Sequence, residues 1–159
     1  MSYTLTIEPI GRTIDINEGQ TILDAALREG IYLPHACCHG LCATCKVQIV
    51  DGEVDHGQAS NFALMDYERE EQKCLACCAT LQSDVVIEAD IDEDPDALNL
   101  PIDDFAGVVE RIENLTPTIK GVWIKLDKPM KFQAGQYVNL SVGELESRAF
   151  SLANVLTRC

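Results

Sequence analysis

The chain has 159 residues, of which 47% are hydrophobic and 24% charged, and its formal net charge is −14. That length suits one ordinary domain, or a small domain joined to part of another. The excess of acid disfavours partnership with nucleic acid or with an anionic membrane, because both would repel the chain. It favours a protein partner that presents a basic docking face.

The beginning of the chain has neither a basic region nor an apolar core, so it does not resemble a secretory signal. No apolar run approaches the length that crosses a bilayer. We therefore expect a cytoplasmic protein. Eight cysteines in such a chain favour metal or redox chemistry over a disulfide framework.

The charge is distributed unevenly along the chain. Residues 1–100 contain 19 acidic and 5 basic residues, whereas residues 101–159 contain 7 of each. Residues 84–104 hold nine acids, two prolines and no Lys or Arg, a composition typical of a linker. The expected division is a first domain over 1–92, an acidic linker over 93–102 and a second unit over 103–159.

The first elements are predicted to be a hairpin and a helix. Residues 3–8 alternate like a strand, and residues 12–16 are the expected partner strand across a turn at Gly11. Thr21 has the position of a helix N-cap and Gly30 that of a helix end, with an apolar stripe between them.

The remainder of the first unit is predicted to add strands over residues 46–50 and 85–88, with a short helix near residues 64–69. A mixed sheet gripping one helix is the simplest assembly of these elements. The second unit has four predicted strands separated by proline and glycine, a spacing that indicates part of an antiparallel barrel. These strands cover residues 105–112, 119–126, 136–142 and 147–152.

The cysteines carry the most specific signal in the chain. Cys37, Cys42 and Cys45 stand in a C-x4-C-x2-C arrangement, and Cys77 follows on a distant segment. This is the spacing of plant-type [2Fe–2S] ferredoxins, in which four thiolates bind the cluster. The predicted metal ligands are therefore Cys37, Cys42, Cys45 and Cys77.

A cluster of this kind needs a loop that can stabilise its negative charge and leave space for it. Four thiolates and two sulfides around two ferric ions leave a dianion, and buried charge needs hydrogen-bond donors. Backbone N–H groups can approach the sulfurs most closely. Gly40 would allow the required dihedral angles, and the small residues Ala36, Ala43 and Ala76 would leave room.

Other readings of the cysteines remain open on spacing alone. Cys42 and Cys45 with Cys74 and Cys77 could form a zinc ribbon, although this leaves Cys37 unused. A chain with such a ribbon would be a non-enzymatic zinc-binding module.

The spare thiols and the histidines have weaker interpretations. Cys38, Cys74 and Cys78 are expected to be small packing residues, and Cys78 is the main rival of Cys77 as a ligand. His35 and His39 could tune a cluster by hydrogen bonding, although histidines in loops are more often surface residues.

Two segments, Leu33–Val47 and Lys73–Cys77, resemble the ferredoxin domain at the N-terminus of bacterial oxygenase reductases. The second segment supports Cys77 over Cys78 as the last ligand. Five further segments are similar to the reductase component of multicomponent phenol hydroxylases: residues 52–57, 62–66, 89–95, 119–122 and 132–140. The resemblance implies an α+β chain in which a β-grasp plant-type [2Fe–2S] ferredoxin domain precedes an incomplete antiparallel β-barrel of the ferredoxin-reductase type.

The resemblance also implies a flavin site. Arg148-Ala149-Phe150-Ser151 is similar to the family motif R-x-[YF]-[ST], so Arg148 would pair with an FAD phosphate. Phe150 would lie against the flavin ring, and Ser151 would hydrogen-bond to it. In the full-length family, NADH reduces FAD, and electrons pass singly through the cluster to a di-iron hydroxylase.

The sequence departs from that family in two respects. It stops at Cys159, without the rest of the barrel or an NAD domain, so we expect an electron carrier that neither holds FAD tightly nor oxidises NADH. A stand-alone ferredoxin serving another oxidase is the alternative. In addition, Cys38 stands where close relatives often have Gly.

Overall fold

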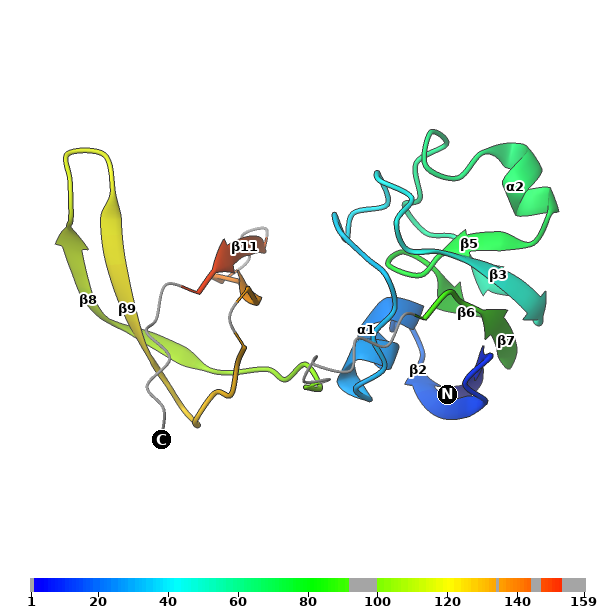
Figure 1. The fold of residues 1–159 in the computed structure, drawn as a ribbon, viewed down its shortest axis with the longest axis horizontal. Coiled ribbons are helices and arrows are strands. Elements are labelled where there is room, and N and C mark those ends of the chain that lie inside the picture. Colours follow the sequence, from blue (N-terminus) through cyan, green and yellow to red (C-terminus); the bar gives the residue numbers. More distant parts are fainter. Residues whose placement is uncertain (1, 92–99, 134, 144–146, 153–159) are drawn as a thin grey trace. The chain divides into compact units, whose positions relative to one another are not determined.

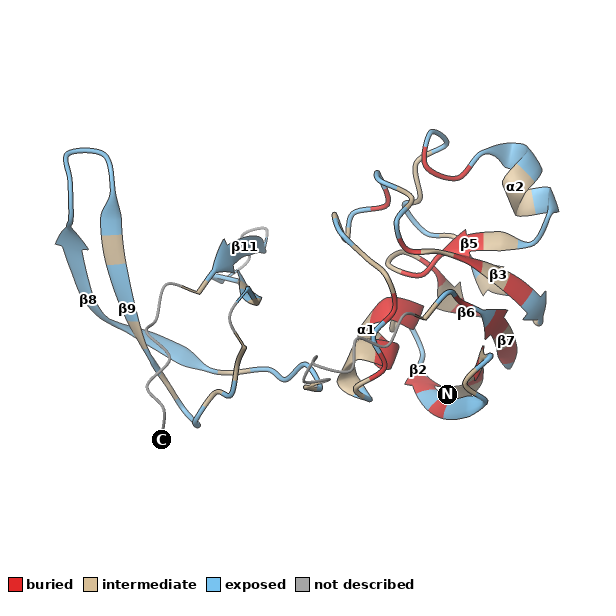
Figure 2. Ribbon diagram, viewed as in Figure 1, coloured by how far each residue is buried: buried red, intermediate tan, exposed pale blue. Residues whose placement is uncertain are grey.

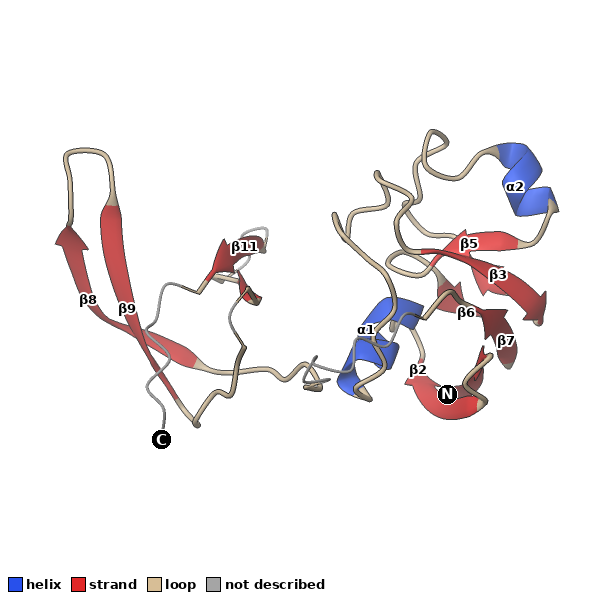
Figure 3. Cartoon of the chain, in the orientation of Figure 1, coloured by secondary structure: helices blue, strands red, loops and turns tan. Residues whose placement is uncertain are grey.

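The computed structural model describes residues 2–91, 100–133, 135–143 and 147–152. These residues form two compact units, divided between Asp103 and Asp104. Figure 3 shows that strands predominate in both units and that the helices belong to the first. The elements of the first unit are β1 (Ser2–Glu8), β2 (Arg12–Asn17), α1 (Ile22–Arg28), β3 (Lys46–Asp51), β4 (Val54–Asp55), α2 (Asp66–Glu70), β5 (Lys73–Leu75), β6 (Thr80–Leu81) and β7 (Val85–Glu88). Those of the second are β8 (Gly107–Asn114), β9 (Lys120–Leu126), β10 (Tyr137–Leu140) and β11 (Arg148–Ser151).

A five-stranded mixed sheet forms the body of the first unit, in the order β2-β1-β7-β3-β5. β1 pairs antiparallel with β2 and parallel with β7, and β3 pairs antiparallel with both β7 and β5. The sheet curls around α1 (Figure 1). This arrangement confirms the predicted β-grasp fold.

The helix α1 fills the concave side of that sheet with its apolar stripe. Ile22, Leu23, Ala25 and Ala26 are all buried, and Figure 2 shows buried residues on α1 and on the strands of the first unit. The Thr21 hydroxyl accepts a hydrogen bond from the third residue of the helix at 3.3 Å, as an N-cap does. The predicted helix start is therefore confirmed.

Three short strands of the first unit were not predicted. β4 and β6 have two residues each and pair with one another, and β5 has three residues and pairs with β3. The short helix α2 begins two residues later than the sequence suggested. It has no side-chain cap at Met65; instead the Glu68 carboxylate accepts a hydrogen bond from the Met65 N–H at 2.9 Å.

The second unit consists of two separate two-stranded sheets, β8–β9 and β10–β11, both antiparallel. Most of its described residues are exposed (Figure 2), among them the apolar side chains of Val108, Ile112 and Val122. The Arg111 guanidinium lies over the Trp123 ring, 3.7 Å from its centroid. The described residues contain no closed barrel, in agreement with the predicted incomplete one.

The linker predicted over residues 93–102 falls mostly outside the described parts of the chain. Its described end belongs to the first unit, because the Ile102 N–H donates to the carbonyl of Leu27 in α1 at 3.1 Å. The predicted domain boundaries stay predictions. Across the described residues, no helix is both long enough and apolar enough to span a membrane.

Candidate metal centre

The loop between α1 and β3 carries three of the four predicted ligands and has an unusual backbone. Cys38, Gly40 and Ala43 have φ angles of 56°, 71° and 60°, all in the left-handed region. Alternation of left-handed with ordinary residues turns successive N–H groups toward one side, which creates a concave site for anions. The prediction that this loop needs special dihedral angles at Gly40 is thus confirmed.

Gly40 is also constrained by its neighbours. A Cβ at this position would stand 2.7 Å from the Cys78 sulfur, 3.1 Å from the carbonyl oxygen of Gln58 and 3.2 Å from the Cα of Ala59. Its own carbonyl accepts a hydrogen bond from the Ser60 N–H at 3.0 Å. The loop of residues 36–45 is therefore packed tightly against residues 58–60.

The four predicted ligands come together in two pairs. Cys42 lies close enough to Cys37 for that residue to influence the pKa of the Cys42 thiol, and Cys77 likewise affects the pKa of Cys45. The fold brings Cys77 to Cys45 because the segment after β5 turns back toward the loop, and the Ala76 N–H donates to the carbonyl of Cys45 at 2.9 Å. Among the described residues, no group of three or more His, Cys, Asp or Glu side chains surrounds a single ion position.

Backbone groups of the loop act on the predicted ligand sulfurs. The His39 N–H donates to the Cys37 sulfur at 3.4 Å. The backbone of Cys37 and of Thr44 also acts to lower the pKa of the Cys42 thiol. These donors stabilise negative charge on sulfur, as the loop of a dianionic cluster requires.

The two pairs differ in how easily they lose protons. The Thr44 hydroxyl, followed by backbone donors, lowers the pKa of the exposed Cys42 thiol to about 6. The pKa of Cys45 is raised, first by the hydrogen bond that it shares with Cys77 and then by burial. Since metal ions bind the thiolate, Cys42 is ready for ligation at neutral pH.

Cys74 lies away from this group. Its side chain is fully buried in the hydrophobic core, at the position of β5 that pairs with Val47. Burial raises the pKa of its thiol to about 12. A zinc ribbon would need Cys74 as a ligand, so its place in the core disfavours that alternative.

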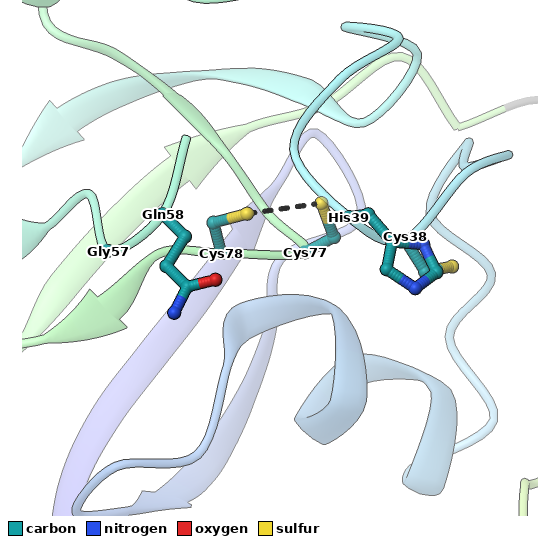
Figure 4. A pocket seen from close by; sticks show the side chains of 6 residues that line it. All are labelled: Cys38, His39, Gly57, Gln58, Cys77 and Cys78. Atoms are coloured by element: carbon teal, nitrogen blue, oxygen red, sulfur yellow. Dashed lines mark hydrogen bonds between the residues drawn. The ribbon is translucent and has the colours of Figure 1, made fainter. Parts of the chain in front are cut away.

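Cys78 lies beside the predicted ligand Cys77, and the two sulfurs are 3.6 Å apart. Figure 4 shows both thiols in a pocket of about 310 Å³ with Cys38 and His39 on one side and Gln58 on the other. The Cys78 thiol fills the space above Gly40, and burial raises its pKa.

The histidines bond to backbone rather than to sulfur in the contacts that the structure shows. His35 Nδ1 lies 2.7 Å from the carbonyl oxygen of Leu33, and His39 Nδ1 bonds to the carbonyl of Cys37. The tuning role considered for them stays a prediction.

A partly exposed ion pair ties the start of β3 to α2. The Lys46 Nζ, one residue after Cys45, lies 2.6 Å from Glu68 Oε1. This lysine, followed by the Met65 N–H, holds the pKa of Glu68 below its usual range. The pair thus links the start of β3 to α2.

The three predicted FAD residues lie on β11. Arg148 pairs with Leu140 and Phe150 with Val138 of β10. Because side chains alternate along a strand, Arg148 and Phe150 share one face of β11, and Ser151 at its end belongs to the other. Phe150 is exposed.

The sequence analysis did not single out Thr44, and it did not predict that the side chains of Leu41 and Phe62 are exposed. A hydroxyl between two ligand cysteines was a usable signal for Thr44. No pattern in the sequence distinguished Phe62, which is 92% exposed, from its buried neighbours Ala63 and Leu64.

Comparison with known proteins agrees with this geometry. The sequence family model "2Fe-2S iron-sulfur cluster binding domain" matches residues 5–82. The chain is 63% identical over 159 residues to the reductase component of phenol 2-monooxygenase from Pseudomonas sp. (strain CF600), covering 99% of this chain and 45% of that protein. It is 60% identical over 155 residues to the phenol hydroxylase P5 protein of Acinetobacter pittii (strain PHEA-2), covering 97% of this chain and 44% of that protein.

Among solved structures, the chain resembles the Amycolatopsis cytochrome P450 reductase GcoB. The TM-score is 0.84 at 35% identity, covering 96% of this chain and 45% of that one. The chain therefore spans about 45% of the length of the relatives that it matches. The predicted resemblance to phenol hydroxylase reductases is confirmed.

Proposed function

We propose, from the membership of residues 5–82 in the family of 2Fe-2S cluster-binding domains, that Cys37, Cys42, Cys45 and Cys77 hold the cluster. The observation that carries this assignment is the pairing of the thiols, Cys42 with Cys37 and Cys45 with Cys77. A binuclear cluster needs two thiolates at each iron, since bridging sulfides occupy the other positions. Two separate pairs of thiols, one for each iron, suit that requirement better than four thiols around a single ion.

The chain's own residues suit a bound anion. Backbone N–H groups such as that of His39 bond to the ligand sulfurs, and the left-handed residues turn further N–H groups the same way. Gly40 allows the loop to lie flat against residues 58–60. When bound, a [2Fe–2S] cluster supplies one-electron transfer, with no need for a general acid or base.

The assignment is tested by the composition and colour of the purified protein. We expect about two irons and two acid-labile sulfides per chain and a brown colour that bleaches with dithionite. A matched pair of variants, Cys77→Ser and Cys74→Ser, separates ligand from core thiol: the first should lose the iron and the second should keep it. Zinc without sulfide would contradict the proposal.

The wider function that we propose is electron delivery to a di-iron phenol or related aromatic hydroxylase, within an NADH-dependent reductase. Its support is the 63% identity to the phenol 2-monooxygenase reductase component. In such a reductase, Arg148 would pair with an FAD phosphate, Phe150 would cover the flavin ring and Ser151 would hydrogen-bond to it. The seven described cysteines are free thiols, which suits the reducing cytoplasm.

The test of the wider function is transfer of electrons from the dithionite-reduced protein to the oxygenase of a phenol 2-monooxygenase system. We expect phenol hydroxylation in single turnover that requires the iron-loaded protein. Equal product yield with the iron-free Cys77→Ser variant would contradict it.

A further inference from the structure

Two apolar side chains stand in solvent beside the candidate metal centre. Phe62 is 92% exposed and Leu41 is 67% exposed. Leu41 precedes the exposed ligand candidate Cys42. Its other neighbour, Gly40, accepts the hydrogen bond from the Ser60 N–H. The segment that carries Phe62 therefore lies directly against the loop that carries Leu41.

The exposure of Phe62 does not come from a loose segment. Its neighbours Ala63 and Leu64 are buried, and their N–H groups donate to the carbonyl of Ser60 at 3.0 and 2.9 Å. The Arg69 guanidinium donates to a backbone carbonyl of the same segment at 3.1 Å. A segment held this firmly keeps an aromatic ring in water at a lasting cost in free energy, and exposed apolar groups of this kind mark interaction sites.

The surroundings of these two side chains are acidic. Residues 41–75 contain seven acidic and three basic residues. Asp66, Glu70 and Glu71 are exposed on or beside α2, which follows Phe62 closely. Lys46 and Lys73 are each engaged with a glutamate. A partner must therefore bring positive charge to the rim and apolar surface to the centre.

We propose that Phe62 and Leu41, rimmed by Asp66 and Glu70, form the docking site for a redox protein with an apolar patch surrounded by Lys and Arg. This inference rests on the proposed function, because it places the partner beside the exposed Cys42. Aromatic anchors at the centre of an interface contribute most of its affinity, and the charged rim mainly accelerates encounter.

The test measures binding without electron flow. Cytochrome c serves as the probe because it is a basic redox protein, and calorimetry at low salt is done with both proteins oxidised. We expect Phe62→Ala to weaken binding about tenfold and Leu41→Ala by a smaller factor. Val50→Ala is the matched control: Val50 is 58% exposed but lies about 16 Å along β3 from Cys45, so its loss should leave the affinity unchanged.

A second measurement separates docking from the centre itself. Ferricyanide, a small acceptor, should take one electron from each dithionite-reduced cluster, after removal of excess dithionite, at the same rate in the parent protein and in Phe62→Ala, and both should contain the same amount of iron. If Phe62→Ala lost both ferricyanide reduction and cytochrome c binding, Phe62 would support the centre rather than a partner. That result would overturn the inference. Equal weakening by Val50→Ala would overturn it as well.

Three further results would decide against it in different ways. Unchanged affinity in Phe62→Ala, with iron present, refutes the docking site and leaves the proposed function intact. Concentration-dependent self-association that Phe62→Ala abolishes would make a second copy of this chain the occupant. Absence of iron and sulfide from all variants would refute the proposed function, and the inference with it.

Discussion

Substitution of Gly40 by alanine should weaken the first unit more than substitution of any open-turn glycine. A residue with a Cβ at a φ of 71° loses about 1–2 kcal/mol in the left-handed region. The Cβ would also stand 2.7 Å from the Cys78 sulfur and 3.1 Å from the carbonyl oxygen of Gln58. Overpacking of that kind costs about 1–3 kcal/mol. The free energy of unfolding should fall by about 2–5 kcal/mol in total.

Gly11 offers the matched control for this variant. Its φ is 62°, yet a Cβ there would meet nothing within 4 Å, so Gly11→Ala should lose only about 1–2 kcal/mol. Urea unfolding followed by circular dichroism measures both, and with a slope of about 2 kcal/mol per molar the Gly40→Ala midpoint should fall by about 1 M or more. In a Cys78→Ala background, Gly40→Ala should cost less, because the nearest atom is gone. Equal midpoints for Gly11→Ala and Gly40→Ala, or no recovery in the Cys78→Ala background, would refute the reasoning.

Four further outcomes are expected. Iron analysis should find the iron lost in Cys77→Ser and retained in Cys78→Ser; the reverse would move the last ligand to Cys78. In native metal-free protein at pH 7, iodoacetamide should modify Cys42 before Cys74, since their thiol pKa values are about 6 and about 12; mass spectrometry of the labelled peptides decides this. The lowered pKa of Glu68 gives stability that is present above its unfolded pKa of about 4.3 and lost as pH falls through the folded value. The urea midpoints of the parent and Glu68→Gln should therefore converge on acidification, and a constant difference from pH 6 to pH 3 would contradict the ion pair. After dialysis with excess FAD, the 159-residue chain should retain no stoichiometric flavin and should show no NADH-driven reduction of cytochrome c above the free-flavin background.

The main helix and strands could be predicted from the sequence because the patterns that indicate them extend over only a few neighbouring residues. The alternation of residues 3–8 and the cap at Thr21 act within a few residues, and the structure has β1 and α1 where these signals predict them. β4 and β6 have two residues each, too few to show a period, and each depends on the other for its hydrogen bonds. No local signal could have found them.

The candidate site likewise has features that the sequence predicts and features that depend on the fold. The spacing of Cys37, Cys42 and Cys45 is local, so the loop could be recognised from the sequence. The packing of Cys78 onto Gly40 joins residues 38 positions apart in the sequence, and it follows from how the chain returns after β5. The outward position of Phe62 likewise depends on hydrogen bonds that only the folded segment makes.

Cys38 shows why the loop tolerates strain. Its φ of 56° is a conformation that costs an L-residue about 1–2 kcal/mol relative to glycine. The same left-handed turn directs the next N–H, that of His39, onto the Cys37 sulfur at 3.4 Å. Hydrogen bonds to a charged acceptor are worth about 1.5–3 kcal/mol each, so a thiolate at Cys37 offsets the strain and a neutral thiol does not. The loop should therefore be less stable in its metal-free, protonated state than in any state that keeps negative charge on its sulfurs.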